Sequence, residues 1–184
     1  VLISDDHGKT YKRMNEKNKH VDSHAIAWKK GDPNYFIIGT DGGLYETFDR
    51  TKTWRQIKNL PLTQFYKVAV DDALPFYNLY GGTQDNGSLG GPSRTMNGAG
   101  IYNRDWKIVL GADGHQSATE PGNPNITYGE FQQGWLWRID QTTGETVFIQ
   151  PQPRAGDPHE RFNWDAPIVV SPHDPKRLYF ASYR

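Results

Sequence analysis

The stretch DPNYFIIGTDGGLYETFDRTKTW, residues 32–54, contains two short apolar runs, FIIGT and GLYET, on either side of Asp41-Gly42. Short runs rich in β-branched and aromatic residues, joined by a glycine-containing turn, predict an antiparallel hairpin. A second turn around Asp49 follows, and Trp54 begins a further run, WRQIK. The stretch therefore predicts three consecutive antiparallel strands.

The first half of this stretch recurs along the chain. Four segments share a proline, a β-rich run and then a small residue: DPNYFIIGTDGG (32–43), LPFYNLYGGTQDNG (74–87), NPNITYGEFQQG (123–134) and DPKRLYFASYR (174–184). Their prolines are 42, 49 and 51 residues apart, and another apolar run lies upstream of each. A repeat of this length with four strands per unit is typical of a β-propeller blade. We expect an all-β fold of four-stranded antiparallel blades.

The repeat also sets the expected blade boundaries. Residues 1–19 form the end of one blade, residues 20–60, 61–110 and 111–157 form three blades, and residues 158–184 start another. All are expected to be part of one β-propeller domain, which has seven or more blades in the parent chain. Because blades bury their faces against neighbours, we expect these residues alone to be weakly stable or to associate through open edges.

Composition agrees with short strands joined by turns. The 184 residues are 35% hydrophobic and 13% aromatic, with 19 glycines and 12 prolines. The absence of cysteine excludes disulfides and thiolate metal sites. No apolar run is long enough to predict a membrane span, and the balanced charge argues against a nucleic-acid partner. We expect no cofactor and no resident metal.

Two eight-residue stretches, SDDHGKTY (4–11) and TFDRTKTW (47–54), begin 43 residues apart. They resemble the Asp-box, S-x-D-x-G-x-T-W, of BNR-repeat propellers. An aspartate in such a turn can accept backbone N–H groups, and glycine adopts a positive φ at little cost. We therefore expect structural turns here, built from Ser4, Asp6, Gly8, Thr10, Tyr11, Thr47, Asp49, Thr53 and Trp54. A third, eroded copy is expected in RIDQTTGET, where Asp140 and Thr146 remain.

Further phrases extend the resemblance over the whole chain, among them YGGTQDNGS and RFNWDAPIVVSPHDPKRLYF. Together they look like bacterial BNR-repeat proteins related to sortilin-type propellers, which are often labelled glycosyl hydrolases, with xyloglucanases as distant relatives. The resemblance implies an exported protein, secreted, periplasmic or at the cell surface, with its signal not visible in these residues. Sialidase activity is disfavoured, because there is no R-I-P opening and the arginines do not fall at equivalent blade positions.

The expected ligand site is the mouth of the central channel, where loops at one end of each blade meet. The candidate catalytic residues in these loops are Asp22, His24, Asp85, Asp113, His115 and Asp165. The candidate ligand-binding residues are Asp41, Gln84, Asp85, Asn86, Glu130, Gln132 and Trp164. Asp-x-His occurs twice, at 22–24 and 113–115, and each carboxylate could orient its imidazole, share a metal with it, or only cap a loop.

Two classes of function fit these residues. The first is a binding module that presents its mouth to a glycan, peptide or protein ligand and packs against the remaining blades of the parent chain. The second is a secreted glycoside hydrolase that resembles xyloglucanases and uses two of the carboxylates above. An inverting pair would have to stand roughly 6.5–9.5 Å apart to hold a water. We favour binding, because the sequence contains no complete catalytic constellation.

Overall fold

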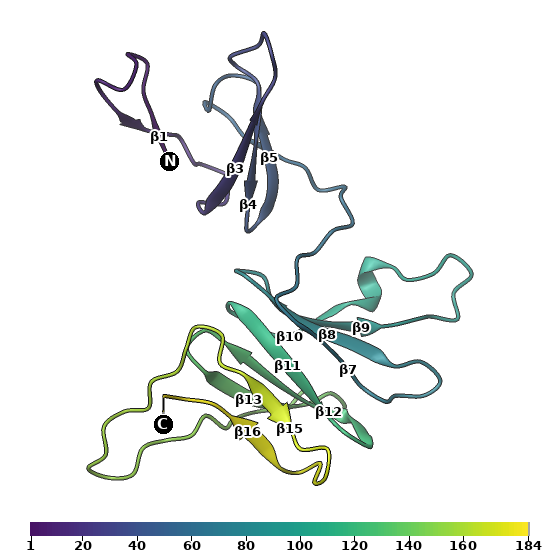
Figure 1. Ribbon diagram of the computed structural model, residues 1–184. Coiled ribbons are helices and arrows are strands. Elements are labelled where there is room, and N and C mark those ends of the chain that lie inside the picture. Colours follow the sequence, from purple (N-terminus) through teal and green to yellow (C-terminus); the bar gives the residue numbers. More distant parts are fainter. Residues whose placement is uncertain (184) are drawn as a thin grey trace. The chain divides into compact units, whose positions relative to one another are not determined.

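The computed structural model describes residues 1–183, which form two compact units, Val1–Leu62 and Thr63 onward. Every sheet in both units is antiparallel. Three of the five sheets have four strands each, in the meander order of a propeller blade (Figure 1). The predicted all-β fold of four-stranded blades is confirmed.

The first unit holds one two-stranded and one four-stranded sheet. Strands β1 (Leu2–Ile3) and β2 (Lys12–Arg13) pair with each other. The second sheet has the order β3-β4-β5-β6, with bounds Ser23–Trp28, Phe36–Thr40, Gly43–Thr47 and Arg55–Gln56. The runs FIIGT and GLYET coincide with β4 and β5. The core of the unit consists of Met14, Phe36 and Ile38, with Ile3 and Trp54 packed against it.

The second unit holds two four-stranded sheets and one two-stranded sheet. The order β10-β9-β8-β7 joins Lys107–Leu110, Gly87–Pro92, Asn78–Thr83 and Val68–Val70, with the 3₁₀ helix η1 (Asn103–Asp105) before β10. The order β11-β12-β13-β14 joins Gly114–Glu120, Asn123–Phe131, Trp135–Asp140 and Thr146–Phe148. The third sheet pairs β15 (Ile168–Val170) with β16 (Leu178–Phe180).

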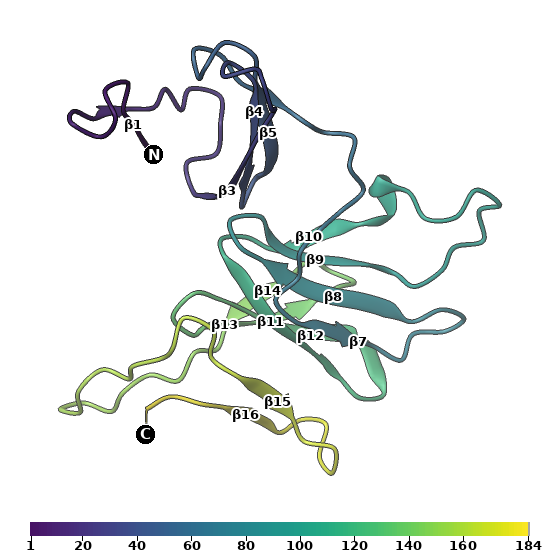
Figure 2. The ribbon, with the colours of Figure 1, turned by 45° about the horizontal axis from the view of Figure 1, so that its top comes forward.

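Within the second unit, β11 links the three sheets. It packs against β7 and β8 of the preceding sheet and against β15 of the following one (Figure 1, Figure 2). The backbones approach closely at Gly82, where an added Cβ would lie 2.2 Å from the carbonyl carbon of Gly114. Gln116 on β11 also holds β15, because its side chain accepts from Ile168 N at 3.1 Å and donates to Ile168 O at 2.8 Å. Successive sheets of this unit are therefore directly packed.

The turns at 4–11 and 47–54 share one hydrogen-bond pattern. In the first, Asp6 accepts from the backbone and the hydroxyl of Thr10 at 2.8 and 2.6 Å, which lowers the pKa of Asp6 to about 2. In the second, Asp49 accepts from both donors of Thr53 at 2.9 and 2.7 Å, and its pKa is also lowered. These aspartates hold the turns together, which is what the motif predicts for a structural role.

The sequence around Asp140 folds differently from these two turns. Asp140 accepts from the backbone and hydroxyl of Thr142 and from the backbone of Thr143, so it closes a shorter turn. Thr146, the expected partner, lies in β14 opposite Ile139. The extra residue in this stretch moves the threonine out of reach of the aspartate and into the next strand.

No helix among residues 1–183 is long and apolar enough to cross a membrane.

Candidate ligand-binding site

In the second unit, the loops at one end of the sheets form a connected polar surface. Its members are Tyr66 before β7, Gln84 and Asp85 in the β8–β9 turn, Asp113 before β11, Gln132 in the β12–β13 turn and Trp164 before β15. We call these six residues the loop-end surface. They are contributed by all three sheets, although they are spread over almost a hundred positions of the sequence.

Hydrogen bonds join neighbouring loops of this surface. The backbone N–H of Asp85 donates to Asp113 Oδ1 at 3.0 Å, and the backbone N–H of Asp113 donates to Gln132 Oε1 at 3.2 Å. The Tyr66 hydroxyl donates to Gln84 Oε1 at 2.7 Å. Because each bond links segments far apart in sequence, the loops are held in one arrangement before any ligand arrives, which lowers the entropic cost of binding.

Two exposed aromatic side chains flank a buried histidine in this surface. Tyr66 is 47% exposed and its ring centroid lies 4.5 Å from that of His115. Trp164 is 44% exposed and meets the same imidazole edge to face at 6.0 Å. His115 itself is fully buried, and neither ring nitrogen has a hydrogen-bond partner among the described residues. Burial lowers the pKa of His115, so the imidazole is uncharged at neutral pH. Both exposed rings pack against this uncharged imidazole.

A pair of carboxyl groups lies beneath the same loops. Glu130 on β12 is fully buried, and burial together with the neighbouring carboxylate of Asp165 raises the pKa of Glu130 to about 9. Asp165 Oδ2 pairs with Lys67 Nζ at 3.0 Å. Asp165 Oδ1 and both carboxyl oxygens of Glu130 have no hydrogen-bond partner among the described residues. These surroundings favour the protonated form of Glu130, because its carboxylate would be desolvated and would be repelled by Asp165.

The structure separates residues that the sequence grouped together. Gln84, Asp85, Asp113, Gln132 and Trp164 meet on one surface, as their loop positions predict. Glu130 and His115 lie in the interior instead. In β12, five consecutive residues from 126 to 130 are buried, since an inner strand has neighbours on both faces, and no alternation of polar residues marks Glu130 as internal.

Two residues of the site were not among the candidates. Lys67 carries the cation that faces the carboxyl pair, and Tyr66 supplies one of the two exposed rings. Tyr66 lies nine residues before the proline of its repeat, as His24 and His115 do in theirs, and this position could have marked it, whereas Lys67 belongs to no recognisable motif.

The Asp-x-His pairs do not form within either triplet. In the first unit, His24 Nε2 pairs with Asp41 Oδ1 at 2.8 Å, while the backbone N–H of Asp22 donates to His20 Nδ1 at 3.3 Å. In the second unit, Asp113 bonds to Asp85, as described above. Asp113 is therefore tied to the preceding β8–β9 loop and His24 to the following β4–β5 turn, so of the alternatives left open for these pairs, orientation of the imidazole by the aspartate of its own triplet is not observed.

Histidine and aspartate also make the first unit a candidate location for a metal. His20, Asp22 and Asp41 each bring one ligand atom within 4.8 Å of the others. These residue types suit zinc. Asp22 is exposed, and Asp41 is already paired with His24. We therefore interpret this group as a surface cluster of ion pairs.

The buried carboxyl pair is poorly suited to glycoside hydrolysis. Glu130 exposes no surface to a substrate, so it cannot reach a glycosidic bond or activate a water beside one in this arrangement. The exposed aromatic and polar side chains above the pair can contact a ligand.

Comparison with known proteins gives a likeness of fold. No protein-family model and no curated protein matches the chain. A solved β-propeller structure, described as YCF48 bound to D1 peptide, is similar over 99% of this chain with 12% sequence identity and a TM-score of 0.42. This chain spans 54% of the length of that one.

Proposed function

We propose that this chain is part of a β-propeller binding module, and that its ligand contacts the loop-end surface. The observation that carries the proposal is the pair of exposed rings, Tyr66 and Trp164, fixed against the buried His115. Rings of this kind provide large contact area at low entropic cost, and the surrounding amides and carboxylates can orient a ligand. The blade segments 1–19, 20–60, 61–110, 111–157 and 158–184 form one propeller domain in this proposal.

The ligand belongs to one of two chemical classes, a glycan or an extended peptide segment of a protein. A glycan would stack on the two rings and hydrogen-bond to Gln84, Asp85 and Gln132, whereas a peptide would place a basic side chain near the carboxylates. The resemblance to BNR-repeat proteins supports an exported setting and makes oligosaccharides the first ligands to test. It also keeps glycoside hydrolysis as the alternative activity.

Titration with xyloglucan oligosaccharides and with a basic peptide library, followed by amide chemical shifts, tests the proposal. We expect Trp164→Ala and Tyr66→Ala each to weaken binding by about tenfold, the loss typical of a central aromatic contact. Tyr179→Ala removes an equally exposed ring from β16 and is the matched control. Binding that survives both loop-end variants unchanged would refute the proposed surface.

A reducing-end assay on the same oligosaccharides separates binding from hydrolysis. Turnover that is lost in Asp85→Asn or Asp113→Asn would favour the hydrolase. Binding without turnover supports the binding module.

A further inference from the structure

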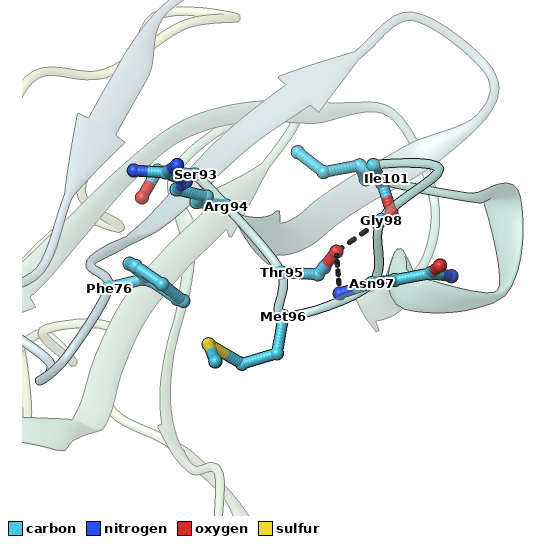
Figure 3. A pocket seen from close by; sticks show the side chains of 9 residues that line it. Phe76, Ser93, Arg94, Thr95, Met96, Asn97, Gly98 and Ile101 are labelled. Carbon is cyan, nitrogen blue, oxygen red and sulfur yellow. Dashed lines mark hydrogen bonds between the residues drawn. The ribbon is translucent and has the colours of Figure 1, made fainter.

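A second surface lies at the opposite end of the β7–β10 sheet, where the β7–β8 and β9–β10 connections meet (Figure 3). In an antiparallel meander these two connections share one end of the sheet, and the β8–β9 turn of the loop-end surface lies at the other. The groove has a volume of about 790 Å³ and is lined by Phe76 and by residues 93–98, 100 and 101. It is therefore separate from the proposed ligand site.

The β7–β8 and β9–β10 connections carry several largely exposed apolar side chains. Met96 is 88% exposed and Leu74 is 93% exposed, while Ile101 is 41% exposed. Met96 extends from the β9–β10 connection toward the same side as the Phe76 ring (Figure 3). Methionine adapts its shape to varied apolar partners, and a concentration of exposed apolar side chains marks an interaction surface.

The groove lining carries one charged side chain, Arg94. The Arg94 guanidinium lies 5.8 Å from the centre of the Phe76 ring, and no carboxylate among residues 1–183 pairs with it. The acidic residues of these two connections accept from backbone N–H groups: Asp71 from Asn78 at 2.6 Å, Asp72 from Gly122 at 2.7 Å and Asp105 from Tyr102 at 2.7 Å. Arg94 is thus available to an incoming carboxylate.

The connection that carries Arg94 and Met96 is held by its own hydrogen bonds. The Thr95 hydroxyl donates to Gly100 O at 2.7 Å, and Gly100 N donates to Asn97 O at 2.9 Å. Ser93 N donates to Tyr77 O at 2.8 Å and ties this connection to the preceding one. The groove is therefore formed in the absence of a partner, which limits the ordering cost of binding.

We propose that this groove binds a protein segment in which carboxylates alternate with bulky aliphatic or aromatic side chains. The carboxylate would form a forked hydrogen-bonded pair with Arg94, and the apolar side chain would lie against Met96 and Phe76. A glycan fits less well, because Arg94 already lies over the ring of Phe76, the one aromatic side chain in the lining on which a sugar could stack. The partner is thus an acidic, apolar peptide, whereas the loop-end surface presents carboxylates of its own.

The peptide acetyl-Asp-Leu-Asp-Phe-Asp-Leu-amide, titrated into the unmodified chain and followed by calorimetry and amide chemical shifts, tests this inference. We expect shifts in residues 93–101, and weaker binding as ionic strength rises. Arg94→Gln should weaken binding by about tenfold, the loss typical of a charge-assisted hydrogen bond. Met96→Thr should weaken it as well, without loss of the fold, because the side chain is almost fully exposed.

A control variant, an uncharged peptide and an acidic oligosaccharide test whether binding depends on Arg94 and on the peptide carboxylates. Arg154→Gln removes another exposed arginine of the second unit and should leave the affinity unchanged within about twofold. The same peptide with asparagine in place of aspartate should bind at least about tenfold more weakly. Equal binding of the two peptides, shifts that avoid residues 93–101, or tighter binding of an oligogalacturonate than of the acidic peptide would each overturn the inference.

Discussion

Replacing Glu130 with glutamine should make the protein more stable, by an amount that grows with pH. In the folded chain, burial and the adjacent Asp165 raise the pKa of Glu130 to about 9, from an ordinary value of 4.5. Between these two values the folded state holds one proton more than the unfolded state. The free energy of unfolding therefore falls as pH rises, by about 1.4 kcal/mol per pH unit for this proton.

Glutamine has nearly the same shape as the protonated glutamic acid, and it cannot ionise. Glu130→Gln and the unmodified protein should therefore be equally stable near pH 4.5 and should diverge above it. At pH 7 the variant should be more stable by about 3 kcal/mol, the linkage free energy accumulated over the intervening pH range. The stabilisation of the unmodified protein by this proton is present at low pH and is lost as pH approaches the raised pKa.

Urea denaturation of both proteins at a series of pH values between about 5 and about 8 measures this difference. Glu145→Gln removes an exposed glutamate between β13 and β14 and serves as the control, whose profile should run parallel to that of the unmodified protein. A difference between Glu130→Gln and the unmodified protein that stays constant over the pH range would refute the raised pKa of Glu130.

Three further changes test the packing and the turns. Gly82→Ala should lower the free energy of unfolding by about 3 kcal/mol in a urea titration, because the new methyl group meets the backbone of Gly114. Gly98→Ala is the control and should leave the free energy of unfolding unchanged, because its new methyl group meets nothing within 4 Å. Gln116→Leu should cost about 2 kcal/mol, since it leaves both backbone groups of Ile168 without partners, and hydrogen exchange at the Ile168 amide should accelerate. Gly8→Ala should cost about 1 kcal/mol, because Gly8 has a φ of +85°; an unchanged thermal midpoint would contradict the role of glycine in this turn.

Much of the fold could be predicted from the sequence, because the strands and turns depend on residues close together in the chain. The strands at 36–40 and 43–47 coincide with the apolar runs that predicted them, since hairpins depend on neighbouring residues and on the turn between them. The turns at Asp6 and Asp49 close on threonines four residues away, so their spacing could be recognised directly. The turn at Asp140 shows the limit of such recognition, because one extra residue changed its partner.

The individual contacts between sheets could not be predicted in this way. Asp85 and Asp113 are 28 residues apart and Asp113 and Gln132 are 19 apart, so their contacts depend on how whole blades pack. The repeat, its strands and the ends at which loops gather follow from the sequence, because turn chemistry and side-chain periodicity act over a few residues. The burial of Glu130, its raised pKa beside Asp165 and the two rings set against His115 follow only from tertiary packing, because burial and the pKa depend on neighbours that the chain brings from other blades.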